Sequence, residues 1–195
     1  MAGILKVDQV QSDSNLAFNI AGSNVAFMNA TSLQMVGSNV SLAGTNVITN
    51  GKVVSSGMPV GSVLQVVQAT TASTYSVTGT TAIATNLTAS ITPSFSSSKI
   101  LIISTYSLYC PGTTKAVSFL YRNATNISAA AGGAYLYSGV GSGAQITTGI
   151  NLLDSPATTS ATTYTIYLAG HNSGASVSFN ADSQNQQIIL MEIAA

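Results

Sequence analysis

The sequence predicts an all-β protein in which a stem of short repeated strands precedes a head with a β-sandwich or jelly-roll-like fold. The first observation is a motif, Ser or Thr followed by Asn and then Leu or Val, which recurs between residues 14 and 51. The second is a series of longer alternating runs from Gly61 onward, rich in the β-branched and aromatic residues that favour strands. The third is that no stretch has the Ala, Leu, Glu and Lys content of a stable amphipathic helix.

The N-terminal residues 1–13 contain three of the ten charged side chains, and the run ILKVDQVQ within them alternates along its length. Neither face of this run is cleanly apolar or polar. We expect either a short strand that enters the repeat or an arm that docks onto a partner.

The repeated motif begins at Ser14, Ser23, Ser38 and Thr45, with a degenerate copy at Ser32-Leu33 in the longer gap. A period of about seven to nine residues is too short for a pair of helices and fits short strands joined by tight turns. Each unit has too few apolar side chains to bury a core of its own. The repeat should therefore fold only against copies of itself, in neighbouring turns, in other subunits, or both. Residues 1–56 are predicted to form this stem.

A turn-rich stretch of Ser, Gly and Pro near residues 56–61 predicts a domain boundary. Beyond it, residues 61–195 are predicted to form the head. The runs expected to be strands are 62–69, 73–78, 81–92, 98–110, 115–123, 133–139, 144–153, 162–170, 175–181 and 186–194.

Charge is scarce along the whole chain. Charged residues make up 5% of the sequence and the net charge is zero, against about 25% charged residues in an average soluble protein. Such a chain does not attract phosphates, which argues against nucleic-acid binding. It also lacks the charge that keeps a monomer soluble, which favours an obligate oligomer within a larger assembly.

Targeting and cysteine signals are equally sparse. The first residues contain no continuous apolar segment of a secretory signal, and the longest apolar run, Ile100–Ile103, is far shorter than a membrane-spanning helix. Cys110 is the only cysteine, so we expect a buried or half-buried, passive thiol and neither an intrachain disulfide nor a cysteine metal cluster.

Catalytic chemistry has few residues to draw on. His171 lies in a Gly/Asn/Ser turn, where Asp154 or Asp182 could orient it toward a Ser, but no nucleophile elbow occurs. An acid pair would have to come from Asp8, Asp13, Asp154, Asp182 and Glu192. The Gly-rich run 139–143 is not followed by a helix, so it predicts a hairpin loop and not a phosphate site. We expect no catalytic residue, no cofactor and no metal.

The tyrosines offer a recognition surface instead. Tyr135 and Tyr137 share one face of a predicted strand beside Gly-rich loops, a position suited to sugar stacking or a protein contact. With His171 and Asn172 they form the candidate ligand-contact set. Tyr164 and Tyr167 fall on opposite faces of one strand, so one of them should belong to the core.

Several segments in the C-terminal part, taken together, carry a family resemblance. They are GSVLQVVQATT (61–71), SITPSFSSSKILI (91–102), LLDSPATTSATTYTIYL (152–168) and the closing IILMEIAA (188–195). With the opening ILKVDQVQ and the Asn-rich repeat, they resemble the tail-fibre-like virion proteins of bacteriophages, and those of cyanophages and marine phages most closely.

The resemblance implies a non-enzymatic homotrimer on the virion exterior, with an intertwined β stem and a β-sandwich head, serving as a short fibre or spike for attachment. Its partners would be its own copies, other virion proteins and a host surface glycan or protein, without membrane insertion. The alternatives are a trimeric capsid decoration (cement) protein or head fibre and, more remotely, a polysaccharide-degrading spike. Three chains around one axis would bury the apolar positions of the repeat, which are Leu16, Phe18, Ile20, Val25, Phe27, Leu33, Met35, Val40, Leu42 and Val47.

Overall fold

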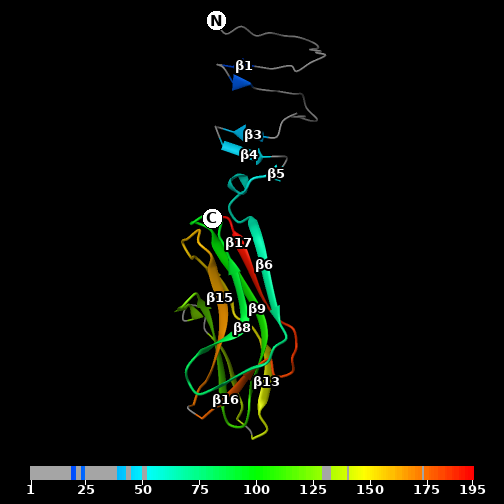
Figure 1. The fold of residues 1–195 in the computed structure, drawn as a ribbon, viewed down its shortest axis with the longest axis vertical. Coiled ribbons are helices and arrows are strands. Elements are labelled where there is room, and N and C mark those ends of the chain that lie inside the picture. Colours follow the sequence, from blue (N-terminus) through cyan, green and yellow to red (C-terminus); the bar gives the residue numbers. More distant parts are fainter. Residues whose placement is uncertain are drawn as a thin grey trace. The chain divides into compact units, whose positions relative to one another are not determined.

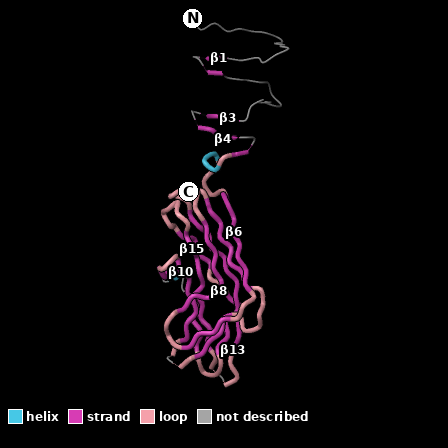
Figure 2. The backbone as a smooth tube through the Cα atoms, in the orientation of Figure 1, coloured by secondary structure: helices cyan, strands magenta, loops and turns pink. Residues whose placement is uncertain are grey.

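The computed structural model describes residues 52–128, 133–139, 141–172 and 174–195, together with residues 19–20, 23–24, 39–42 and 45–49 of the N-terminal part. The chain divides into two compact units, Met1–Gly57 and Met58–Ala195, and each unit is described by itself. Figures 1 and 2 show that the second unit, the head, consists of strands and connecting loops.

The described residues of the first unit form short antiparallel strands. β1 (Asn19–Ile20) pairs with β2 (Ser23–Asn24), and β3 (Asn39–Leu42), β4 (Thr45–Thr49) and β5 (Lys52–Val53) form a three-stranded sheet in that order. A single 3-10 turn, Ser55–Gly57, follows.

The predicted trimer contacts in this unit stay a prediction. Ile20, Val40, Leu42 and Val47 lie in these strands, without a description of their side chains. The other predicted positions, Leu16, Phe18, Val25, Phe27, Leu33 and Met35, lie outside the described residues.

The head is a sandwich of two antiparallel sheets, as the sequence predicted (Figure 1). Sheet I contains β8 (Ile83–Ile91), β15 (Thr162–Gly170), β10 (Lys115–Arg122), β11 (Thr125–Asn126) and β12 (Ala134–Tyr137). Sheet II contains β6 (Val63–Thr71), β17 (Gln186–Ile193), β9 (Lys99–Cys110), β16 (Ser176–Phe179), β7 (Tyr75–Thr78), β13 (Ala144–Thr148) and β14 (Asn151–Asp154). The all-β prediction is confirmed.

Three details of the head differ from the sequence prediction. The run 144–153 forms two strands, β13 and β14, that follow one edge of β9 with a break at Gly149 and Ile150. The short strand β11 was not predicted; it pairs with the end of β10. The Gly-rich run 139–143 is not a hairpin loop, because β12 pairs in sheet I and β13 in sheet II, so this segment crosses between the sheets.

Alternation along each strand builds the core. In β9 every second side chain from Ile100 to Cys110 is buried, and β15 and β17 show the same period of two. Successive side chains of a strand point to opposite faces, so one set fills the space between the sheets. Tyr164 is fully buried in this core, whereas Tyr167 lies on the opposite face of β15. Cys110 is buried as expected.

Hydroxyl and amide side chains form hydrogen bonds with polar groups that are buried in this interior. The Tyr106 hydroxyl of sheet II shares a hydrogen bond of 2.7 Å with the Ser118 hydroxyl of sheet I, and burial raises the pKa of Tyr106, although the bond to Ser118 acts to lower it. Where β9 changes partner from β17 to β16, the Gln186 side chain accepts the Ser107 N–H and the Asn180 N–H donates to the Ser107 carbonyl. These two bonds satisfy the backbone groups of Ser107 in the gap between the β17 and β16 pairings.

Gly149 provides a test of the close approach between β9 and the β13–β14 segment. A Cβ at this position would clash with the Ser104 carbonyl oxygen, which is backbone and cannot rotate away. We expect Gly149→Ala to lower the free energy of unfolding by about 1–3 kcal/mol, measured by denaturant titration. Gly141→Ala is the matched control, because a Cβ there meets nothing within 4 Å. Equal stabilities of the two variants would contradict this account.

Candidate functional site

The outer face of sheet I carries a group of aromatic side chains. Along β10 the outward positions are Lys115, Val117, Phe119 and Tyr121, because the intervening residues through Leu120 are buried. The chain has eight Tyr and five Phe residues. Five of them lie on this face, which we call the aromatic face: Phe119, Tyr121, Tyr135, Tyr137 and Tyr167.

Strand register places these side chains next to one another. Tyr137 lies opposite Lys115 and Tyr135 lies opposite Val117 across the β10–β12 pair. On the other edge of β10, Tyr167 lies opposite Phe119, and its ring stacks on Tyr121 with centroids 3.8 Å apart. Directly opposite side chains in an antiparallel pair are in contact distance, so the face is continuous across three strands.

One end of the aromatic face combines exposed rings with a cation. Tyr135 is 51% exposed and Tyr137 is 57% exposed. The Lys115 ammonium lies 5.5 Å from the centroid of the Tyr135 ring and 5.4 Å from that of Tyr137, within the range of cation–π attraction. The His171 ring meets Tyr135 edge-on at 6.4 Å. We call Lys115, Tyr135, Tyr137 and His171 the Lys115 cluster.

The structure thus brings together three of the four predicted ligand-contact residues. Asn172 follows His171 in the exposed turn, where its carbonyl accepts the Ala175 N–H. Sequence reasoning missed Lys115. The available signal was its position at the start of an alternating run, but only the β10–β12 register shows that it faces the two Tyr rings.

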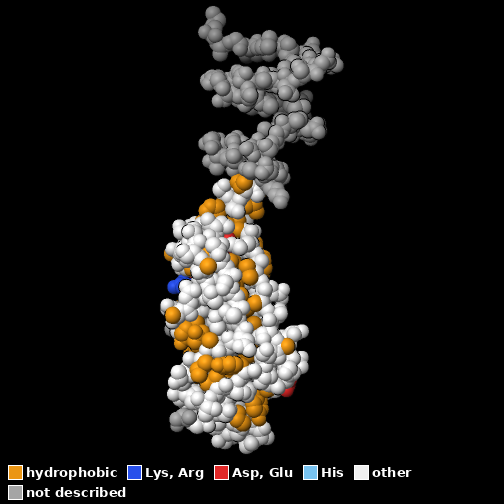
Figure 3. Space-filling model, in the orientation of Figure 1, with side chains coloured by type: hydrophobic (Ala, Val, Ile, Leu, Met, Phe, Trp, Pro, Cys, Tyr) orange, Lys and Arg blue, Asp and Glu red, His pale blue; other side chains and the backbone are white. Residues whose placement is uncertain are grey.

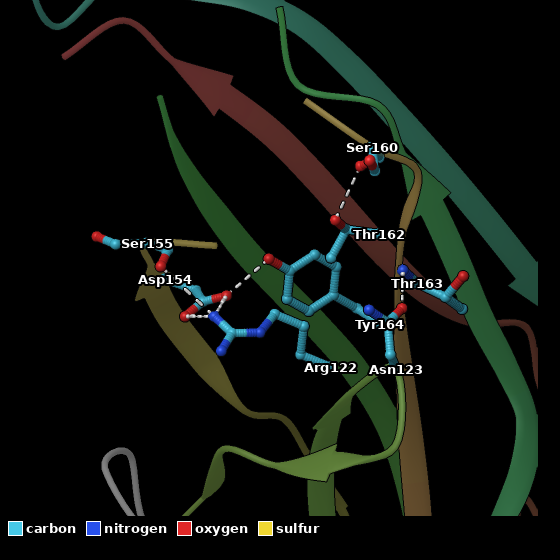
Figure 4. Close-up of polar contacts among 8 residues, drawn as sticks. All are labelled: Arg122, Asn123, Asp154, Ser155, Ser160, Thr162, Thr163 and Tyr164. Carbon is cyan, nitrogen blue, oxygen red and sulfur yellow. Dashed lines mark hydrogen bonds and ion pairs between the residues drawn. The ribbon is translucent and has the colours of Figure 1, made fainter. Parts of the chain in front are cut away.

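Arg122 and Asp154 form a structural ion pair in the head. Figure 4 shows the Arg122 guanidinium of β10 donating to both carboxylate oxygens of Asp154 of β14, at 2.9 Å each. The Tyr164 hydroxyl of β15 donates to the same carboxylate at 2.7 Å. Burial, together with this bond and the charge of Asp154, raises the pKa of Tyr164 above its ordinary value. The three side chains join sheet I to sheet II.

Glu192 is a fully buried carboxylate whose hydrogen-bond donors are neutral groups. Its oxygens accept hydrogen bonds from Gln65 Nε2 at 2.7 Å, from Ser98 Oγ at 2.7 Å, and from the backbone N–H and hydroxyl of Ser94 at 2.6 and 3.1 Å. Burial by itself raises the pKa of Glu192, but these hydrogen bonds outweigh it and leave the pKa below its ordinary value. The carboxylate holds the 92–98 loop against β6 and β17.

Among the described residues, Asp154, Asp182, Glu192 and His171 each make contacts of their own, and Asp8 and Asp13 lie outside the described residues. Asp154 and Glu192 occupy the two strands on either side of Ile100 of β9, each within its own hydrogen-bond set. Asp182 accepts a hydrogen bond from Gln145, and His171 belongs to the Lys115 cluster. Within the described ranges, no three His, Cys, Asp or Glu side chains gather as a metal site. The same ranges contain no helix long and apolar enough to cross a membrane.

The rest of the head surface carries little charge. The face in Figure 3 shows hydrophobic patches separated by uncharged polar surface, with very few charged side chains. Hydroxyl pairs between β8 and β15 lie next to the aromatic face on the outer side of sheet I. Thr88 bonds to Thr165 and Ser90 to Thr163, both at 2.7 Å.

The Glu192 site predicts an acid-sensitive stability. Because its folded-state pKa is below the ordinary 4.5, its ionised form stabilises the fold above that pH, and this contribution is lost as pH falls through the lower folded value. Glu192→Gln directs an amide N–H at hydrogen-bond donors, so we expect the free energy of unfolding at pH 7 to fall by about 1–3 kcal/mol relative to the wild type. Between pH 7 and pH 3 the variant should lose less stability than the wild type does. Thermal unfolding across this range, with Asp182→Asn as the exposed control, would show it. An unchanged pH profile would refute this role.

Comparison with known proteins yields structural likeness only. No protein-family model matches the chain, and no curated protein matches it. Among solved structures, a mutant VP2 protein of infectious bursal disease virus in derived T=1 particles aligns with a TM-score of 0.37 at 12% identity, over 84% of this chain and 41% of that one. The structure of the infectious bursal disease virus Gx strain aligns with a TM-score of 0.34 at 12% identity, over 84% and 42%. The chain therefore spans about two fifths of the length of these proteins.

Proposed function

We propose that the protein is a non-enzymatic structural protein on the exterior of a phage virion, a homotrimeric short fibre or spike that serves attachment. The observation that carries this proposal is the aromatic face, a recognition surface on rigid strands of a head in which Asp154 and Glu192 hold the fold together. A site built on strands keeps its geometry more precisely than one built on loops. The resemblance to tail-fibre-like proteins supports the same role.

A second surface supports assembly with other copies. On the outer face of sheet II the cross-strand register forms one apolar row, Val66–Met191–Leu101–Leu153, across β6, β17, β9 and β14. Val66 is 56% exposed and Leu153 is 50% exposed. An apolar row in water on a nearly uncharged head favours burial against another subunit, because contiguous exposed apolar surface marks interaction sites.

The structural contacts of Asp154 and Glu192 support a role without catalysis. A polysaccharide-degrading spike needs an accessible acid pair. Asp154 is committed to Arg122 and Tyr164, and the fully buried Glu192 is committed to three neighbours. Depolymerase activity of the purified protein that is abolished by Asp154→Asn would overturn this part of the proposal.

Mass and position test the proposal together. Sedimentation should give three times the 19.7 kDa of one chain, and labelled antibodies should locate the protein on a tail or spike of the intact particle. A species of one chain mass would contradict the trimer. Binding to empty shells with a rise in their disruption temperature, and no affinity for host cells, would support the decoration-protein alternative instead.

A charge in the repeat tests the predicted trimer core. Val25→Asp would place three like charges in an apolar interior, and an isolated buried ion costs several kcal/mol even after relaxation. We expect loss of the trimer in sedimentation at micromolar concentration. Val60→Asp, at a position that is 82% exposed, adds the same charge at a solvated site and should leave the trimer intact. Equal behaviour of the two variants would exclude Val25 from the interface.

A further inference from the structure

We infer that the Lys115 cluster binds an acidic saccharide chain, and that the rest of the aromatic face extends the site. This inference rests on the proposed attachment role and specifies its ligand chemistry. It follows from four features of the outer face of sheet I: exposed rings, a cation beside them, a fixed geometry and an elongated shape.

The exposed rings favour a sugar. Tyr135 and Tyr137 leave about half of their surface in water, and a tyrosine offers an apolar ring face together with a hydroxyl that forms hydrogen bonds. Sugars present the complementary surface, with C–H faces that stack on rings and hydroxyls at their edges. The Ser and Thr hydroxyl pairs between β8 and β15 provide a polar border to the same face.

The cation favours an acidic sugar. In the described part of the chain, Arg122–Asp154 is the one salt bridge. The other two acids of the head, Asp182 and Glu192, accept hydrogen bonds from neutral groups. Lys115 therefore holds a positive charge over two rings, and no carboxylate of the described residues forms an ion pair with it. The carboxylate of a uronic or sialic acid would supply the missing anion.

The strands hold the cluster in place before any ligand binds. The β10–β12 register fixes Lys115 opposite Tyr137, and the Lys115 carbonyl accepts the His171 N–H at 3.0 Å, which ties the turn to the strand. A Cβ at Gly139 would lie 3.3 Å from Tyr137 Cε1, so glycine lets the loop lie directly against this ring. A preorganised site loses less entropy on binding.

The shape favours a chain over a single sugar. From Lys115 to Tyr121 the outward positions of β10 extend over about 20 Å, the length of several sugar units. The Tyr121–Tyr167 stack lies at the far end of this stretch. An oligosaccharide lying along β10 would contact both ends of the aromatic face at once.

The test uses the full-length protein and paired probes. Isothermal titration calorimetry would measure binding of hexamers of galacturonate, of alginate and of sialic acid, with fully methyl-esterified galacturonate hexamer as the uncharged partner. We expect at least one acidic hexamer to bind with a Kd below about 1 mM and more weakly as salt is raised. If the acidic hexamers all fail to bind, or the ester binds as tightly as the acid, the inference is wrong.

Matched variants locate the site. Lys115→Ala should weaken binding about tenfold, as should Tyr137→Ala. Lys99→Ala removes an exposed cation of sheet II and should bind as the wild type does. Equal weakening by Lys99→Ala and Lys115→Ala would overturn the assignment. If the wild-type protein is a trimer on the particle but binds no saccharide, only this inference is refuted. If the wild-type protein is a monomer that binds saccharide, the proposed function is refuted.

Discussion

The head depends on β9, a strand of twelve residues that is paired along both edges. β14 and β13 follow one edge, and β17 and β16 follow the other. A strand this long offers many backbone donors and acceptors, and each must be satisfied once it is buried. Where a neighbouring strand leaves, a side chain takes over: Gln186 bonds to the Ser107 N–H, and the Ser104 hydroxyl bonds to the backbone of Ile150. The sandwich is organised around this requirement.

Two of the few ionised groups of the head, Asp154 and Glu192, have structural roles. Asp154 joins the two sheets through Arg122 and Tyr164. Glu192 holds a loop with neutral donors, and four hydrogen bonds to one carboxylate offset the cost of burying it. Polar residues without charge cover most of the remaining surface. Lys115 differs from these groups because its charge lies beside two aromatic rings, which is why we propose it as a recognition residue.

The two outer faces of the sandwich have different chemistry. Sheet I presents tyrosines with hydroxyl neighbours, a surface suited to a hydrated ligand. Sheet II presents an aliphatic row that includes Val66 and Leu153, a surface suited to burial against protein. Such a division would let one sheet hold subunits together while the other remains free to bind. The subunit contact and the ligand site that we propose would then lie on opposite faces of the sandwich, on strands held by the same core.

The sequence by itself determined the strands and their faces, because a period of two can be read from residue types. The run 162–170 was predicted with the bounds of β15, and Tyr164 and Tyr167 were placed on opposite faces. Tyr135 and Tyr137 were singled out for the same reason. Only the tertiary structure decided which strands are neighbours: alternation gives the face of a side chain but not its cross-strand partner. The approach of Lys115 to both rings, the bridge from Arg122 to Asp154 and the crossing of 139–143 between sheets all depend on pairing between distant segments.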